Sequence, residues 1–357
     1  MKPVEVIIAV HTPTRPIARA VASVLDGNAA HASLTVVCHN VELDVIAAEL
    51  PPAHRDHVAW LAHTDGHRSA SGPFNAGMRA SDAEFVSIMG SDDTLSPGAV
   101  DSWVAVARKT GAESVLTRLS LGQPDKAVPT PPARRWHNGL ADPIKDRLSY
   151  RSAPLGLVSN AARQRLGAQL VEGMRVGGDV SYVTRLWCET KVAIDRNGPG
   201  YVIGEDATDR VTLDPRSITE EFTFLRHLLA QGWFAGYPEE LRTTIVTKLV
   251  RIHVFGAIWY RQDPGWWTAD ERVALAQMME QFAQAAPNFA KPLSRADHAL
   301  LQAASDPSIE AQTLLGAAKA RRRHGRPATL IPAHLSQLLH PEAPPRFMAA
   351  SWLATRA

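Results

Sequence analysis

The chain has 357 residues, of which 45% are hydrophobic, enough for a sizeable core in one large or two ordinary domains. Its 38 Lys and Arg residues nearly balance 36 Asp and Glu residues, and this net charge of +2 gives no case for a nucleic-acid-binding protein. The two cysteines lie far apart in the sequence, which argues against a disulfide scaffold and fits a reducing compartment. Neither a signal peptide nor a run of 18 apolar residues occurs. We therefore expect a cytoplasmic protein without a transmembrane helix.

The first two hundred residues alternate short apolar runs with helical patterns. The runs that predict strands lie at residues 4–10, 34–38, 58–61, 85–89, 114–118, 153–158 and 192–194. Helical spacing lies between them, for example at residues 16–25, 44–50 and 72–80. Strands alternating with helices imply a mainly parallel sheet covered on both faces. The proline-rich, basic segment 122–138 is expected to form a loop.

The fourth predicted strand ends at two adjacent acidic residues, Asp92 and Asp93. Ser96 and Pro97 follow, and they predict the N-cap and first turn of a helix. Carboxylates at the carboxyl end of a strand lie where α/β sheets bind ligands. One or two carboxylates, together with phosphate oxygens, can hold a hard divalent cation. The pattern therefore indicates either a cation site or a solvated acidic turn before a helix.

The pattern changes beyond about residue 216, where helical spacing replaces the strand signals. The helical segments are residues 218–229, 238–252, 269–285, 295–304 and 309–320. The proline-rich tail 327–345 is expected to be partly irregular. We therefore predict a first domain at residues 1–215 and an all-helical C-terminal domain at residues 216–357, which serves in binding a further molecule or in oligomerisation.

Several landmarks resemble the family-2 inverting glycosyltransferases, which have a GT-A fold. The landmarks are the opening segment 7–13, the helical segment 19–25, Gly72 to Gly77, and Phe85 to Asp93, whose end resembles the family's Asp-x-Asp metal motif. A later Gly177-Gly178-Asp179 resembles the helix start that supplies the catalytic base. The resemblance covers about residues 3–215 and implies a Rossmann-like, mainly parallel α/β sheet.

The resemblance also assigns roles to individual residues. It implies that Asp179 is the catalytic base, although an aspartate there could equally be a helix N-cap. It implies that Asp92 and Asp93 bind the metal. The residues that it places on the nucleotide sugar are Val10, Thr12, Pro13, Asn40, Asp65, Asn75, Ser91, Asp92, Arg210 and Arg216. Ordinary turns, a helix cap and surface salt bridges would also account for several of these.

Four positions depart from the family pattern. Gly90 stands where an aspartate is usual, which leaves Asp92 and Asp93 for the metal. The second strand ends in Cys38-His39-Asn40 rather than in acidic residues, so base recognition is altered or uses Asn40. Phe74 replaces a frequent arginine, and Gly178 replaces an acid that often precedes the base.

The chemistry agrees with the resemblance. A diphosphate leaving group develops negative charge that a metal neutralises, and inversion needs a carboxylate to take the proton of the acceptor hydroxyl. We therefore expect an inverting hexosyl- or N-acetylhexosaminyltransferase that uses Mn²⁺ or Mg²⁺ and a nucleotide-diphospho sugar, most readily a UDP-sugar. Its acceptor would be a glycan, a polymer or a lipid-linked molecule, as in cell-surface glycan biosynthesis.

Other interpretations stay open. A non-catalytic relative that binds a nucleotide or glycan would explain Gly90, and a sugar nucleotidyltransferase would need a Gly-rich basic loop that residues 11–15 do not provide. The run 319–326 carries five cations, and aromatic pairs occur at 259–260 and 266–267. Such a surface suits an anionic glycan or the inner face of a membrane. It also fits helices that pack on the catalytic domain or form a homo-oligomer.

Overall fold

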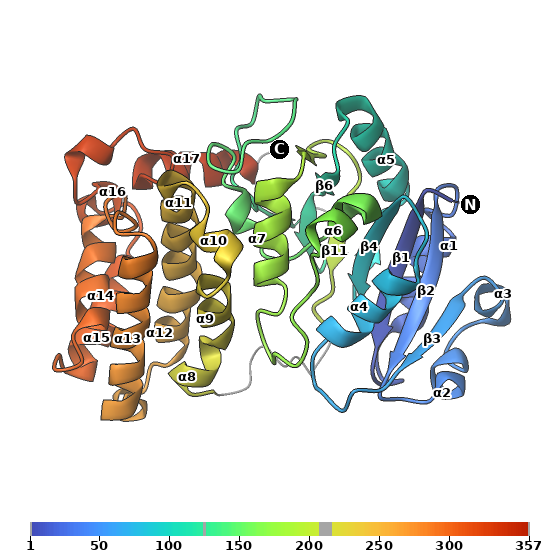
Figure 1. Ribbon diagram of the computed structural model, residues 1–357, viewed down its shortest axis with the longest axis horizontal. Coiled ribbons are helices and arrows are strands. Elements are labelled where there is room, and N and C mark those ends of the chain that lie inside the picture. The colour runs from blue at the N-terminus through green and yellow to red at the C-terminus, as the bar shows by residue number, and fades with distance from the viewer. Residues whose placement is uncertain (1, 124–125, 207–215, 356–357) are drawn as a thin grey trace.

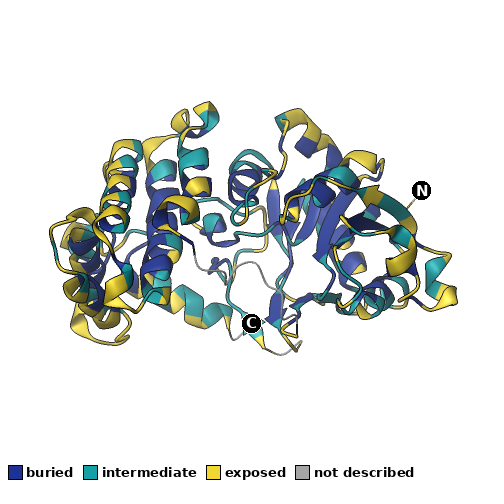
Figure 2. Cartoon of the chain, turned by 90° about the horizontal axis from the view of Figure 1, so that it is seen from below, coloured by how far each residue is buried: buried dark blue, intermediate teal, exposed yellow. Residues whose placement is uncertain are grey.

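The computed structural model describes residues 2–123, 126–206 and 216–355. Its two parts lie side by side along the long axis in Figure 1. An α/β part, coloured blue to green, contains the sheets, and a helical part, coloured yellow to red, contains helices alone. Figure 2 shows the buried residues along the strands and on the inner faces of the helices in both parts.

The central sheet has seven strands in the order β10-β6-β9-β4-β1-β2-β3. Neighbours pair in parallel except β9, which is antiparallel to both β4 and β6. The strands are β1 (Val4–Val10), β2 (Ala32–His39), β3 (Ala59–His63), β4 (Phe85–Gly90), β6 (Ser114–Leu116), β9 (Gly156–Ser159) and β10 (Val192–Ile194). The mainly parallel sheet predicted from the sequence is thereby confirmed.

Helices cover both faces of this sheet because successive side chains of β1 point to opposite sides. Ile8 packs in one core with Val21 and Trp103, whereas Ile7 packs in another with Met78 and Trp187. The helices are α1 (Ile17–Leu25), α2 (Leu43–Ala47), α3 (Pro52–Arg55), α4 (Ser71–Ala80), α5 (Ala99–Thr110), α6 (Asn160–Leu166) and α7 (Val180–Glu189).

A second, four-stranded sheet lies beside the end of β4. Its order is β5 (Thr94–Leu95), β11 (Tyr201–Ile203), β7 (Leu119–Leu121) and β8 (Ala127–Val128). The predicted loop 122–138 therefore contains the short strand β8. The helix start predicted at Ser96 and Pro97 is wrong, because Gly98 adopts a left-handed φ of 75° and α5 begins only at Ala99.

The C-terminal part is helical, as predicted, and the described residues after 215 contain no strand. It consists of α8 (Ile218–Glu221), α9 (Thr223–Leu229), α10 (Gly232–Ala235), α11 (Glu239–Leu249), a π-helical segment η3 (Val250–Val254), α12 (Phe255–Tyr260), α13 (Ala269–Ala285), α14 (Arg295–Ser305), α15 (Ala311–Arg321), α16 (Pro327–Leu330) and α17 (Pro344–Ala354), with short 3₁₀ turns at Pro264–Trp266 and Leu335–Gln337. Another 3₁₀ turn, Leu148–Tyr150, lies in the α/β part. Val180 of α7 belongs to the apolar core of the C-terminal part, so the two parts share packing. No helix in the described residues is long and apolar enough to cross a membrane.

The tail after α16 returns to the α/β part, and α17 lies across the junction at the top of Figure 1. Glu342 is fully buried there. Its Oε2 accepts hydrogen bonds from the Tyr150 hydroxyl and from Arg251 Nη1, each at 2.7 Å. Arg135 Nη1 donates to the carbonyl oxygen of Leu353 at 3.2 Å. The tail therefore ties the helical part to the loop that carries Tyr150.

The predicted basic surface at 319–326 is partly internal. Arg321 pairs with Asp297 at 2.5 Å, and its guanidinium lies 4.7 Å from the ring centroid of Phe255. Arg322 lies 4.2 Å from the ring centroid of Trp259. These contacts hold α15 on α12 and α14, so Arg321 has a packing role that its place in a basic run did not indicate.

Candidate active site

The end of β4 carries the two acids of the predicted metal motif, and they have different surroundings. Both oxygens of Asp93 accept protein hydrogen bonds: one from the Tyr201 hydroxyl and one from the backbone N–H of Gly204 at 2.8 Å. Burial raises the pKa of Asp93 even though these donors oppose the rise. A Cβ at Gly90 would lie 2.5 Å from Asp93 Oδ2. The Asp93 carboxylate thus takes the space that an acid at position 90 would need.

Asp92 instead faces two arginines that follow β1. Arg15 Nη1 lies 3.0 Å from Asp92 Oδ1. Arg19 Nη2 donates to the Asp92 carbonyl oxygen at 2.7 Å, and the same guanidinium forms a two-point ion pair with Asp206 at 2.7 and 3.0 Å. The sequence analysis did not assign a role to either arginine. Their spacing of four residues just after a strand was the signal available.

The other residues predicted near β1 and β4 lie at the same carboxyl edge of the sheet. Val10 is the buried last residue of β1, and Ser91 is buried directly after β4. Thr12 and Pro13 form the turn after β1, where the Thr12 and Thr14 hydroxyls are 3.1 Å apart. The edge is therefore assembled as expected, while the contact of these residues with a nucleotide stays a prediction.

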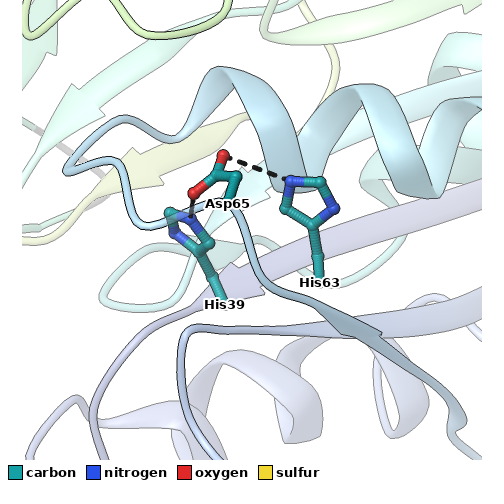
Figure 3. A group of neighbouring side chains, drawn as sticks. All are labelled: His39, His63 and Asp65. Carbon is teal, nitrogen blue, oxygen red and sulfur yellow. Dashed lines mark hydrogen bonds and ion pairs between the residues drawn. The ribbon is translucent and has the colours of Figure 1, made fainter.

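Two histidines and an aspartate meet at the ends of β2 and β3. Figure 3 shows His39 and His63 on either side of Asp65. His39 Nε2 lies 2.7 Å from Asp65 Oδ1, and His63 Nε2 lies 3.2 Å from Asp65 Oδ2. Burial opposes ionisation of Asp65, but hydrogen bonds from His39, from the His67 backbone and from His63 hold its pKa below the ordinary value. The Asp65 carboxylate is therefore ionised at neutral pH.

Asn40 shapes the loop that presents this cluster. Its backbone has a φ of 54°, and its Oδ1 accepts hydrogen bonds from the N–H groups of Asp65 and Gly66, both at 3.1 Å. Its Nδ2 donates to the His67 carbonyl oxygen at 3.2 Å. The sequence analysis placed both Asn40 and Asp65 on the nucleotide sugar, and the structure brings the two residues together.

The same cluster has a donor set that differs from the predicted metal site. One ligand atom from each of His39, His63 and Asp65 lies within 4.8 Å of the others. Two imidazoles and one carboxylate suit Zn²⁺ and related transition metals, whereas Mg²⁺ and Mn²⁺ prefer oxygen ligands. A hard cation bound to phosphates would therefore use Asp92, because both oxygens of Asp93 already bond to protein donors.

Asn75 of α4 holds the segment that leads to the predicted base. Its Nδ2 donates to the Leu170 carbonyl oxygen and to Glu172 Oε1, both at 2.8 Å, and its Oδ1 accepts from the Leu170 N–H at 3.0 Å. Asn75 is 2% exposed. These bonds give it an anchoring role, and its predicted contact with the nucleotide stays a prediction.

Asp179 lies at the start of α7, but its side chain does not cap the helix. In the described parts of the chain, no other residue donates a hydrogen bond to its carboxylate. Gly177 has a φ of 70°, and a Cβ there would run into the Phe224 ring. A Cβ at Gly178 would collide with Ser71 Oγ and would lie 2.7 Å from the Val171 carbonyl oxygen. Both glycines are thus required by packing, which explains the missing acid at Gly178.

The surroundings of Asp179 favour proton uptake near neutral pH. Burial raises the pKa of Asp179 to about 6, and the positive charge of Lys248 opposes the rise. The side chain is only partly buried. A carboxylate with this pKa is ionised at pH 7 and is still basic enough to accept a proton.

Two arginines that follow Asp179 in the sequence, Arg210 and Arg216, were predicted to contact the nucleotide sugar. Arg210 lies outside the described residues. Arg216 Nε pairs with Glu221 Oε2 at 3.1 Å, and Arg261 Nη2 pairs with the same oxygen at 3.0 Å. The salt-bridge alternative is therefore present for Arg216, and its role on a diphosphate stays a prediction.

No family model matches the chain, and no curated protein matches its sequence. Solved structures of S. aureus TarS do match. Residues 1–349 of TarS in complex with UDP-GlcNAc give a TM-score of 0.72 at 12% identity over 90% of this chain and 92% of that one. The same TarS fragment with UDP gives 0.67 at 13% identity, with the same coverage of both chains. A longer TarS structure, of which the match covers 56%, also gives 0.67 at 12% identity. The chain therefore has a TarS-like fold, which confirms the GT-A architecture expected from its sequence.

Proposed function

We propose that the chain is an inverting glycosyltransferase that moves a sugar from a UDP-sugar to an acceptor hydroxyl. The observation that carries the proposal is Asp179. It lies at a helix start after two packed glycines, with its pKa raised to about 6 and no hydrogen bond from another described residue. A carboxylate in that state is available to take a proton.

The donor class follows from the fold and from the charges at the sheet edge. The similar TarS structures contain UDP-GlcNAc or UDP. Arg15 and Arg19 gather at Asp92, where the resemblance places the diphosphate. Guanidinium groups suit phosphates because one guanidinium can donate two parallel hydrogen bonds to two phosphate oxygens. We assign the binding of the donor's nucleobase to Asn40 and Asp65, and the binding of its diphosphate to the turn after β1.

In the proposed reaction, Asp179 takes the proton of the acceptor hydroxyl while that oxygen attacks the anomeric carbon from the face opposite the diphosphate. The bond between the anomeric carbon and the diphosphate oxygen breaks, and UDP leaves with the electron pair. Assistance by such a base is worth roughly 10²–10⁴ in rate. Arg15 and Arg19 would stabilise the charge that develops on the diphosphate.

A divalent metal, Mn²⁺ or Mg²⁺, belongs to the proposal with Asp92 as its protein ligand. When bound, it would neutralise charge on the leaving diphosphate. The oxygen donor of Asp92 fits such a hard cation. Arg15 already pairs with that oxygen, so a metal would have to compete with an arginine for Asp92. For this reason we expect the metal to strengthen donor binding less than it would in a site with two available carboxylates.

The acceptor is proposed to be a glycan, a polymer or a lipid-linked molecule, bound between the α/β part and the helical part. Asp179 supports this position, because Val180, the residue after it, packs into the core of the helical part. An acceptor hydroxyl that reaches Asp179 must therefore approach the junction of the two parts.

A nucleotide-binding relative without transferase activity is the second candidate. Gly90 and the internally bonded Asp93 favour it, because they reduce the acids available to a metal. The two candidates differ in whether donor binding is followed by release of UDP.

The test combines donor binding with turnover. We expect UDP-GlcNAc or another UDP-sugar to raise the unfolding temperature more than GDP- or dTDP-sugars do, with and without Mn²⁺. A ligand at 100 times its dissociation constant adds about 2.7 kcal/mol to the free energy of unfolding. Release of UDP on addition of glycan acceptors would support the transferase. Tight UDP-sugar binding without UDP release across those acceptors would support the second candidate.

A further inference from the structure

The helical part places a buried lysine behind the proposed base. Lys248 lies in the last turn of α11 and is 2% exposed. Its ammonium donates to Ser152 Oγ, in the α/β part, at 2.8 Å, and lies 2.9 Å from His253 Nε2. The charge is therefore held at the junction of the two parts by two neutral acceptors.

The π-helical segment Val250–Val254 creates this arrangement. Side chains three or four residues apart face each other on an α-helix, but Lys248 and His253 are five apart. The wider turn of a π-helix follows an i→i+5 pattern and brings such residues together, and these turns are frequent at functional sites. Within the described chain, no carboxylate forms an ion pair with Lys248. A buried ammonium without such a partner is costly, so the arrangement calls for an explanation.

A series of contacts links Lys248 to the start of α7. His253 packs edge-on against Phe224, with ring centroids 5.1 Å apart. The Phe224 ring in turn fills the space beside Gly177, two residues before Asp179. The lysine, the histidine and the phenylalanine thus form the wall behind the Gly-Gly-Asp turn, and they all come from the helical part.

We propose that Lys248 is a positioning residue, which keeps the Asp179 carboxylate ionised so that it can take the acceptor's proton. The inference rests on the proposed function of Asp179. A nearby cation favours the charged form of a carboxylate, whereas burial alone favours the neutral acid. Lys248 keeps its own protons throughout the transfer, and His253 and Ser152 hold it in place. The helical part would then complete the catalytic site as well as pack against it.

The charges at this site form a small set. Among the described residues, the positive charge of Lys248 is the one that acts on Asp179. Burial lowers the pKa of Lys248 to about 8, and the negative charge of Asp179 opposes that fall. Burial and the adjacent lysine hold the pKa of His253 well below its ordinary value. His253 is therefore neutral and accepts through Nε2. Ser152 and Phe224 add no charge.

The test is the pH dependence of transfer in Lys248→Gln and Lys248→Met. Both substitutions remove the positive charge. The glutamine side chain can still donate hydrogen bonds to Ser152 and His253, whereas methionine cannot. We expect the acid limb of kcat/KM to move to higher pH by about one unit in each variant. The rate on the plateau above that limb and the KM for the donor should stay within about threefold of the original protein, as expected when only the ionisation of the base has changed.

The controls separate this role from a structural one. Lys109→Gln removes an exposed lysine from α5 and should leave the acid limb unchanged. Lys248→Arg restores the charge and should return the limb toward its original position. An unmoved acid limb in folded Lys248→Gln and Lys248→Met would overturn the inference, provided that Asp179→Asn is inactive. Normal transfer by Asp179→Asn would instead overturn the proposed function, so the two failures are distinguishable.

Discussion

The end of β4 and the start of α7 each carry a partly buried acid with a raised pKa, yet the two acids are held in opposite ways. Asp93 accepts hydrogen bonds from Tyr201 and from Gly204 and fills the space beside Gly90. Asp179 has no donor from another described residue and faces the junction with the helical part. A raised pKa alone therefore does not identify a catalytic group. The donors around a carboxylate indicate whether it maintains the fold or is available for chemistry.

The largest effect that tests this contrast is expected from Asp179→Asn. The amide cannot accept a proton, so transfer should fall by roughly 10² or more. Donor binding, measured by the shift in unfolding temperature with UDP-sugar, should be retained. The unfolding temperature without ligand should stay the same or rise, because the substitution removes a charge that its surroundings disfavour. Full transfer by Asp179→Asn would remove Asp179 from the proposed mechanism.

Asp93→Ala should do the reverse and weaken the fold. It leaves the Tyr201 hydroxyl and the Gly204 N–H without their acceptor, and an unsatisfied buried donor costs about 1–3 kcal/mol. Chemical denaturation should show this loss in the free energy of unfolding. Tyr201→Phe removes one of the two donors and also leaves the Gly90 N–H, which donates to that hydroxyl at 3.0 Å, without its acceptor, so it should be destabilised as well. Unchanged stability in Asp93→Ala would mean that Asp93 is not the structural acid.

The pH dependence of transfer should separate activity from folding. The ionised form of Asp179 is the active one, so transfer should fall about tenfold per unit as pH drops below about 6. Because the folded-state pKa of Asp179 is raised, this group makes the fold more stable, not less, as pH falls from 6 toward its unfolded value. Asp65, Asp146 and Asp297 have lowered pKa values, and their stabilisation is lost only at lower pH. Circular dichroism should therefore stay native at pH 5 while transfer declines. Parallel loss of both signals would contradict this assignment.

Local sequence patterns predicted the sheet, and the resemblance to a glycosyltransferase family directed attention to Asp179. Strand β1 was predicted at its observed bounds, because Val4–Val10 is apolar apart from Glu5 and is followed by the polar His11. Gly177-Gly178-Asp179 also stands out locally, since paired glycines mark close backbone approach. The start of α5 was missed because Gly98 takes a left-handed conformation that Ser96-Pro97 does not indicate.

The partners of the site residues could not be predicted, because they are distant in the chain. Tyr201 is 108 residues from Asp93, and Asp206 is 187 residues from Arg19. Lys248 reaches the site from another part of the fold, and Arg321, interpreted as part of a basic surface, pairs with Asp297. Side-chain periodicity reports which face of an element is apolar, but it carries no information about which polar groups meet across the fold.

Asp92→Ala gives the smallest expected effect and sharpens the comparison at the end of β4. Asp92 pairs with Arg15 at 3.0 Å, and both side chains are largely buried, so its loss should lower the free energy of unfolding. The loss should be smaller than for Asp93, whose removal leaves the Tyr201 hydroxyl and the Gly204 N–H without an acceptor. If Asp92 holds the cation that bridges the phosphates, UDP affinity measured with Mn²⁺ should fall, by about tenfold when the lost stabilisation is about 1.4 kcal/mol. The affinity without Mn²⁺ should change little or rise, because Arg15 then loses its ion pair with Asp92 and a guanidinium suits phosphate oxygens. The double variant Asp92→Ala and Asp93→Ala should then lose the effect of Mn²⁺ on UDP binding. An unchanged Mn²⁺ effect in that variant would show that neither carboxylate binds the metal and would direct attention to His39, His63 and Asp65.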